Sequence, residues 1–185
     1  MDMELLGWPE DGPTLNLDHE RFSYAGKFVM SATGKAVCRD DEIVAAVAFS
    51  EDRTDPNALW LRYVTVRRDR RGDGIGPELV GFVVERARER GYERVRIAVN
   101  NPYAYEALYR AGFGFTGERT GIAELVLEWP GDRSPETYRA GLEEFAGRDL
   151  SGDEREFLDR RREAGPPPVE SGVDSGELSP SWETE

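Results

Sequence analysis

Residues 59–76 read LWLRYVTVRRDRRGDGIG, and this stretch decides the fold. A run of β-branched and aromatic residues, typical of a strand, passes into an arginine-rich loop that closes with the letters GDGIG. Glycine lets the backbone turn through positive φ and lie close to a ligand, and Pro77 suits the first turn of a helix. Because a helix N-terminus carries unpaired N–H groups and partial positive charge, residues 71–77 predict a phosphate-binding turn between a strand and a helix.

The residues after this loop predict a helix and a second strand. Residues 77–90 carry apolar side chains on one face at helical spacing, and Gly91 suits the C-terminal end of a helix. Residues 92–99 alternate between apolar and polar side chains, as a strand does. Two strands joined by one helix in this way form a parallel, right-handed βαβ unit.

Three glycine-rich phosphate motifs compete for the loop. The dinucleotide fingerprint G-x-G-x-x-G fails because Pro77 stands where the third glycine belongs. The P-loop fails because Gly76 is followed by Pro77 and Glu78. The third pattern, Arg/Gln-x-x-Gly-x-Gly/Ala after a strand, is matched by Arg71, Gly74 and Gly76. An ordinary glycine-rich turn is the alternative to all three.

The third pattern resembles the acyl-CoA pyrophosphate loop of the GNAT acyltransferase superfamily. Residues 101–113, NPYAYEALYRAGF, resemble the second signature of that family and keep its spacing at Asn101, Ala104, Gly112 and Phe113. The resemblance covers about residues 20–130. It implies an α/β fold, with a mixed, mostly antiparallel twisted sheet, a central splayed pair of parallel strands and flanking helices.

The resemblance also implies a reaction, the direct transfer of an acetyl group from acetyl-CoA to a primary amine by an N-acetyltransferase without a metal. Residues 64–66 are expected to pair with pantetheine, residues 71–76 to bind the pyrophosphate through main-chain N–H groups, and Asn101 to fix pantetheine from the next strand. The expected cofactor-binding residues are Val64, Thr65, Val66, Arg71, Gly72, Asp73, Gly74, Ile75, Gly76 and Asn101. A non-catalytic module that binds acyl-CoA is the alternative function.

The resemblance implies a tyrosine that protonates the leaving thiolate, four residues before the Gly-Phe pair. Leu108 holds that position, so Tyr109 is the first candidate and Tyr105, one turn earlier, the second. Core packing by aromatic residues on a helix face is the alternative for both. No general base stands out, and Glu106 and Glu124 are weak candidates that are more typical of surface charges.

The acceptor side departs from the family pattern. The relatives insert two helices between their first two strands, whereas a first strand at Phe22–Met30 leaves only Met30–Gly34 for them. Two alternatives remain: helices expected at 135–146 and 151–163 fold back over the acceptor side, or a second subunit of a homodimer supplies it. Arg62 and Arg96 either bind an acidic acceptor or lie solvated on the sheet.

The sequence divides into four segments. We expect an irregular lead-in at 1–18, the GNAT-like domain at 19–131, a C-terminal helical extension at 132–163 and a disordered acidic tail at 164–185. Within the domain, residues 35–39 and 43–49 predict a hairpin, 50–57 a loop, and 113–118 with 122–129 a second hairpin.

The formal net charge is −13, and only two of the 24 basic residues are lysines. Such a surface repels nucleic acid and anionic membranes, so neither is an expected partner. We favour adaptation to a salty cytoplasm, as in a halophilic organism, over steering of a cationic substrate, because the acidic residues are spread along the chain. The cluster at Arg67–Arg71 fits a polyanionic cofactor.

Other features predict a cytoplasmic protein. No apolar run approaches the ~20 residues that span a bilayer, and the first residues lack the pattern of a signal peptide. A lone cysteine, Cys38, excludes an internal disulfide and suits a small buried side chain, while the single His19 suits the surface.

Overall fold

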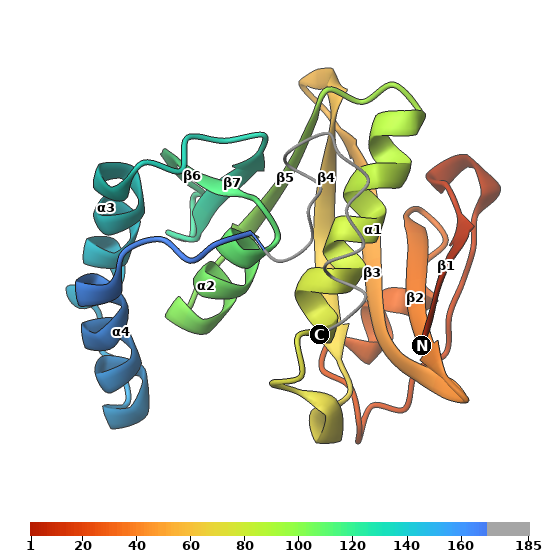
Figure 1. Ribbon diagram of the computed structural model, residues 1–185. Coiled ribbons are helices and arrows are strands. Elements are labelled where there is room, and N and C mark those ends of the chain that lie inside the picture. Colours follow the sequence, from red (N-terminus) through yellow and green to blue (C-terminus); the bar gives the residue numbers. More distant parts are fainter. Residues whose placement is uncertain (170–185) are drawn as a thin grey trace.

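The computed structural model describes residues 1–169, which build an open seven-stranded sheet in the order β1-β2-β3-β4-β5-β7-β6 (Figure 1). The β4–β5 pair is parallel and the other neighbouring pairs are antiparallel, which confirms the mixed sheet expected from the sequence. The strands are β1 (Asp2–Gly7), β2 (Gly34–Asp40), β3 (Glu42–Asp52), β4 (Asp55–Val66), β5 (Arg94–Val99), β6 (Gly114–Arg119) and β7 (Leu125–Trp129).

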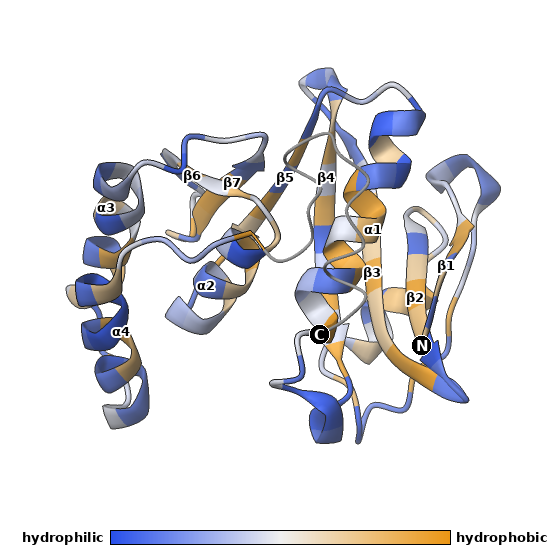
Figure 2. Ribbon diagram, in the orientation of Figure 1, coloured by the Kyte–Doolittle hydropathy of each residue, from blue (hydrophilic) through white to orange (hydrophobic). Residues whose placement is uncertain are grey.

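Four α-helices accompany the sheet, and their positions confirm the helices predicted from apolar spacing. They are α1 (Ile75–Glu89), α2 (Pro102–Arg110), α3 (Pro135–Ala146) and α4 (Gly152–Ala164). Both α1 and α2 pack on one face of the sheet, where their apolar residues join those of the strands in one core (Figure 2). No helix within residues 1–169 is long and apolar enough to cross a membrane.

The first thirty residues differ from the prediction. Residues 2–7 form the edge strand β1 and not an irregular lead-in, and the strand expected at Phe22–Met30 is replaced by a 3₁₀ helix over Ala25–Val29. Phe22, Ala25 and Phe28 are buried at a spacing of three, which is the period of a 3₁₀ helix. The segment between β1 and β2 is therefore residues 8–33, much longer than the Met30–Gly34 link expected.

Residues 8–33 cover part of the second face of the sheet. Phe28 packs against Val37, Ala46 and Ala48 there, with further apolar residues of the segment around it. The segment is fastened by Lys35, which is fully buried. Its ammonium, which has three N–H donors, lies within hydrogen-bond distance of the carbonyl oxygens of Pro13 (2.7 Å), Met30 (2.6 Å) and Thr33 (2.9 Å) and of the Thr33 hydroxyl (2.8 Å).

The predicted hairpins are present, but the turn of the first is shorter than expected and that of the second, residues 120–124, is longer. Asp41, at φ 65°, turns β2 into β3, as predicted. The loop expected at 50–57 is wrong, because β3 runs to Asp52 and β4 starts at Asp55. In the tight turn between them, the Asp52 carboxylate accepts from the Thr54 N–H at 2.9 Å.

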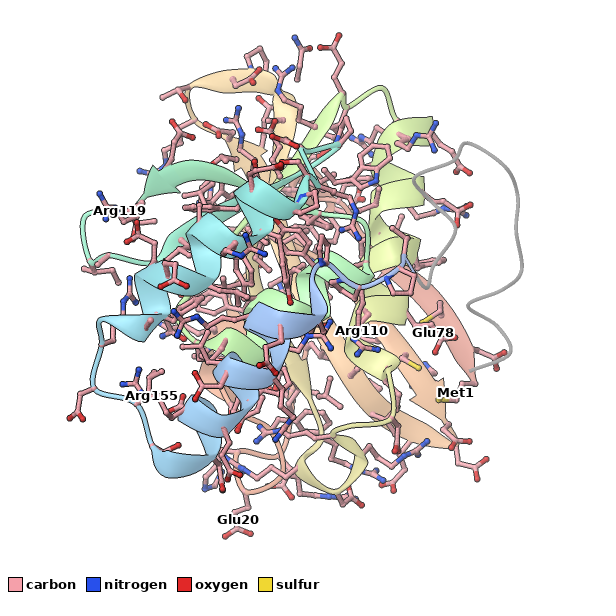
Figure 3. The ribbon with its side chains drawn as sticks, turned by 60° about the vertical axis from the view of Figure 1, so that its left-hand side comes forward. Met1, Glu20, Glu78, Arg110, Arg119 and Arg155 are labelled. Carbon is pink, nitrogen blue, oxygen red and sulfur yellow. The ribbon has the colours of Figure 1, made fainter. Side chains whose placement is uncertain are left out.

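The C-terminal helices pack on α2 and beside the edge strand β6, away from residues 8–33 (Figure 1). Ser151 and Glu154 form the capping box predicted for α4. Arg155, labelled in Figure 3, donates to the carbonyls of Ala146 and Arg148 and so ties α4 to the end of α3. Most of the predicted acidic tail, from residue 170 on, lies outside the described residues.

Candidate functional site

The two parallel strands separate at the centre of the sheet. Their pairing runs from Ala58 opposite Arg94 to Leu61 opposite Ile97 and goes no further. Beyond Leu61, β4 continues to Val66 and pairs with β3 alone. Residues 62–66 therefore turn one row of main-chain groups toward a gap that β5 does not fill. The predicted pantetheine-binding residues Val64, Thr65 and Val66 lie along this gap.

The direction of the main-chain groups can be read from the end of β4. The Arg67 N–H donates to the Val44 carbonyl of β3 at 2.8 Å. Because successive residues of a strand direct their main-chain groups to opposite sides, the N–H groups of Val66 and Val64 point away from β3 and into the gap. Two N–H donors therefore face the space between β4 and β5.

The predicted phosphate turn follows directly. Gly72 (φ 88°) and Gly74 (φ 80°) adopt left-handed conformations, and Gly74 is the N-cap of α1. The N–H groups of residues 72–76 donate to no carbonyl or side chain of the described chain, although the Glu78 N–H bonds to the Gly74 carbonyl. This row of free N–H groups at the start of a 15-residue helix suits an anion.

The arginines around the turn contribute less free charge than the sequence suggested. Arg67 pairs with Asp69 at 2.6 Å, and this hydrogen bond holds the pKa of the Asp69 carboxyl below its usual value. Arg70 pairs with Asp40 at 3.0 Å, and Arg68 donates to the Glu20 carbonyl. The turn must therefore hold an anion chiefly through its N–H groups.

Arg71 and Arg68 are both exposed and form no ion pair with a described residue, since Arg68 contacts main-chain carbonyls. Of the two, Arg71 contacts the end of β4. Its guanidinium donates to the Val66 carbonyl at 3.3 Å and to the Ser23 hydroxyl at 3.1 Å. One cation therefore stands at the point where the gap meets the phosphate turn.

Asn101 lies just beyond the end of β5 and is the N-cap of α2. Its side-chain oxygen accepts from the Ala104 N–H at 2.9 Å, and its amide nitrogen donates to Asn100 at 3.2 Å. The predicted contact with pantetheine stays a prediction, since this side chain already caps the helix. Its position still brings the two sequence motifs to the same end of the parallel strand pair.

Tyr105 and Tyr109 lie in the core and not at the gap. Both are fully buried, with ring centroids 4.9 Å apart, and both pack against Tyr138 of α3. The Tyr105 hydroxyl donates to the Tyr138 carbonyl at 3.0 Å, and the Tyr109 hydroxyl accepts the Phe115 N–H at 3.0 Å. Burial raises the pKa of both hydroxyls. This geometry favours the packing role for both, and the acid role stays a prediction.

Comparison with known proteins decides the family. The acetyltransferase (GNAT) family model matches residues 2–115. The chain belongs to the GNAT family. A search of curated proteins gave no match. Membership of an acetyltransferase family makes acyl transfer the activity to test.

Several solved acetyltransferase structures are similar to this chain. A Bacillus subtilis acetyltransferase in complex with CoA aligns at a TM-score of 0.53 and 15% identity over 68% of this chain and 95% of that chain. Nourseothricin acetyltransferase has 27% identity and a TM-score of 0.46 over 52% of this chain and 64% of that chain. The Brucella melitensis ribosomal-protein-alanine N-acetyltransferase has 20% identity and a TM-score of 0.46, over 52% of this chain and 67% of that chain. The chain thus spans less than two thirds of the nourseothricin enzyme.

The carboxylates considered as bases are engaged elsewhere. Glu106 is not the surface charge that the sequence suggested, because it is 4% exposed. Its carboxylate accepts from the Tyr138 hydroxyl at 2.6 Å and pairs with Arg161 of α4 at 3.2 Å. Sequence reasoning missed this link, since the partners lie more than thirty positions away in the extension. Glu124 accepts from Thr120 beside the β6–β7 turn.

Arg62 and Arg96 both lie on the face of the sheet opposite α1, but they differ in their charge partners. Arg96 pairs with Asp52 at 2.9 Å and with Glu128 at 2.6 Å, so its charge is balanced. Arg62 donates to the Ser50 hydroxyl at 2.8 Å and forms no ion pair with a described residue. The sequence left both residues either as candidates for an acidic acceptor or as solvated residues. The acceptor role stays a prediction, and Arg62 is the one of the two without a carboxylate partner among the described residues.

A cavity of about 610 Å³ lies elsewhere, between β6, the end of β7 and α3. Glu128 lines it and pairs with Arg96 near the start of β5, whereas Leu125 pairs with Val99 beside the gap. The cavity is therefore at the opposite end of these strands from the candidate site. Within residues 1–169, no group of three or more His, Cys, Asp or Glu residues is placed to hold a metal ion.

Proposed function

We propose that this GNAT domain is an N-acetyltransferase that moves the acetyl group of acetyl-CoA to a primary amine by direct transfer. The observation that carries the proposal is the gap between β4 and β5, which opens beside a helix N-terminus with five free N–H groups, those of Gly72, Asp73, Gly74, Ile75 and Gly76. A thioester attached to a diphosphate needs both features at once. The known ability of the family to use acetyl-CoA supports the choice of donor.

In this proposal the pantetheine arm lies along β4 beside residues 64–66 and pairs with their free main-chain groups. The diphosphate binds the N–H groups of the 72–76 turn, and the positive end of α1 favours its charge. Asn101 borders the arm from the end of β5. The acyl carbon then stands in the gap, where an amine can reach it from the face opposite α1.

The chemistry forms one bond and breaks one. The amine nitrogen attacks the thioester carbonyl, the C–N bond forms, and the oxyanion is held by a main-chain N–H that faces the gap, which in this proposal is that of Val64. The intermediate then collapses, the C–S bond breaks, and the thiolate takes up a proton while the nitrogen releases one to water. Holding both reactants in place supplies up to ~7–11 kcal/mol of the rate enhancement.

The rival function is acyl-CoA binding without turnover, and one observation favours it. Tyr105 and Tyr109 are buried with their hydroxyls engaged, and Glu106 is paired, so the candidate acids and base lie away from the gap.

Two measurements on the full chain separate these functions. Calorimetric titration with CoA tests the site, and release of free thiol from acetyl-CoA with a panel of amines tests the reaction. Binding together with thiol release supports the transferase, and binding without release on any amine supports the rival. Absence of CoA binding would refute both.

A further inference from the structure

The β4 strand carries a bulge where it leaves β5. Ala48 of β3 pairs with Tyr63 and Phe49 pairs with Leu61, so Arg62 is an extra residue in the strand. A bulge interrupts the alternation of side chains, and it puts the consecutive residues Arg62 and Tyr63 on the same face, opposite α1. Tyr63 packs there with the apolar cluster around Phe28, and the Arg62 guanidinium lies 5.4 Å from the centre of the Trp60 ring.

Arg62 is short of negative charge. Its neighbours on this face, Arg94 and Arg96, are both paired with carboxylates, whereas the partners of Arg62 are the Ser50 hydroxyl, the Glu51 carbonyl and the Trp60 ring. Burial and the nearby Arg53 lower the pKa of its guanidinium, while the Asp52 carboxylate, which is paired with Arg96, acts in the opposite direction. In a chain with a net charge of −13, a half-buried guanidinium without a carboxylate is a place for an anion from outside.

Further groups line the same strand. Thr65 lies on this face opposite Ala46, is 4% exposed, and its hydroxyl has no hydrogen-bond partner in the described chain. Lys27 places its ammonium 5.8 Å from the centre of the Tyr63 ring. Tyr24, which is 55% exposed, packs against Tyr63 with its ring tilted by 42° and the ring centroids 5.6 Å apart. An orphan hydroxyl, a second cation and an accessible aromatic ring therefore accompany Arg62.

We infer that the acceptor is an amine that also carries a carboxylate, bound by Arg62, with α-amino acids of apolar or aromatic side chain as its simplest members. The inference rests on the proposed acetyl transfer. Arg62 lies two residues before Val64, and because Arg62 is the bulged residue the two lie closer than the ~6.6 Å that a regular strand gives at ~3.3 Å per residue. An amine at the acyl carbon beside Val64 therefore has its own carboxylate on the side of Arg62. The Tyr24–Tyr63 pair then meets the side chain, and C–N bond formation and C–S cleavage proceed as above.

The test compares acceptors that differ only in the carboxylate. Phenylalanine, phenylalanine amide and phenethylamine are each assayed for thiol release from acetyl-CoA. We expect kcat/KM for phenylalanine to exceed that for the two analogues without a carboxylate by about tenfold or more, because a charge-assisted pair is lost in the analogues. Equal values for all three would overturn the inference and leave the transferase function standing.

Variants of the full chain test whether the preference for a carboxylate depends on Arg62. Arg62→Met keeps the apolar stem and is expected to lower kcat/KM for phenylalanine by about ten- to a hundredfold, and to lower kcat/KM for phenethylamine by a much smaller factor. Arg139→Met removes an exposed arginine of α3 and is the control for lost charge. If Arg62→Met unfolds, Arg62→Gln replaces it. An equal loss with both acceptors would contradict the assignment.

A binding measurement separates failure of the inference from failure of the function. N-acetylphenylalanine and N-acetylphenethylamine are titrated into the complex of the protein with CoA. Tighter binding of the carboxylate compound, lost in Arg62→Met, supports the anion site even when no amine releases thiol. Equal binding of the two compounds rejects it.

Discussion

Replacing Gly74 by alanine tests the phosphate turn most directly. Gly74 stands at φ 80°, where a Cβ approaches the following carbonyl and costs about 1–2 kcal/mol. The loop relieves this strain by turning away, which moves the N–H groups that face the proposed diphosphate. Each hydrogen bond to a charged group is worth about 1.5–3 kcal/mol, so the loss of one raises the Kd for CoA about ten- to a hundredfold.

Gly76→Ala is the matched control. Gly76 has no positive φ, and an added Cβ lies 3.5 Å from a Val66 methyl group, which is an ordinary contact. Alanine in the first turn of α1 is expected to stabilise the fold by up to about 0.5–1 kcal/mol and to leave the Kd nearly unchanged. Calorimetry gives the Kd and urea unfolding the stability. Unaltered affinity in Gly74→Ala, or an equal loss in both variants, would refute the reasoning.

Three further predictions concern the buried polar groups and the extension. Tyr109→Phe removes the acceptor of a buried N–H, so we expect the free energy of unfolding to fall by about 1–3 kcal/mol with kcat within twofold; a hundredfold fall in kcat would instead establish the acid role. Burial lowers the pKa of Lys35 from 10.5, so the unfolded chain binds more protons between the lowered pKa and 10.5, and stability must rise with pH in that window. Lys35→Met should remove this rise, as urea titrations at several pH values will show, and a rise that persists would assign it to another group. Gly141→Ala places a Cβ against the Tyr105 ring and should cost about 1–3 kcal/mol, whereas Gly147→Ala, with open space around it, should cost far less; equal unfolding midpoints would contradict this packing.

Sequence patterns located the elements whose signals are local. The helix α1 has a regular apolar face, and the capping box at Ser151 marks the start of α4, so both were predictable. The strand β1 has only a short apolar pair in six residues, and its pairing with β2 is long-range. Residues 22–30 carry apolar side chains at a spacing of three, which a search for periods of 2 and 3.6 misreads.

In the candidate site, too, features with local sequence signals were predictable and features that depend on long-range contacts were not. The glycines predicted the phosphate turn, and the N-cap position predicted the place of Asn101. Both signals are local, because these conformations depend on neighbouring residues. Ion pairs such as Arg67 with Glu42 join positions far apart in the chain, so no local pattern shows that the arginines are neutralised. The burial of Glu106 depends on how α3 and α4 dock, which apolar spacing alone does not reveal.

The separation of β4 from β5 leaves an opening through the sheet, which connects its two faces. In the proposed reaction the nucleotide carrier occupies the helix side and the amine arrives from the other side, so neither blocks the other. Steady-state kinetics should then be sequential, with a ternary complex before any product leaves. An inhibitor that joins an analogue of acetyl-CoA to an analogue of the amine has to pass through this opening. The length of the linker between its two parts is therefore set by the thickness of one sheet.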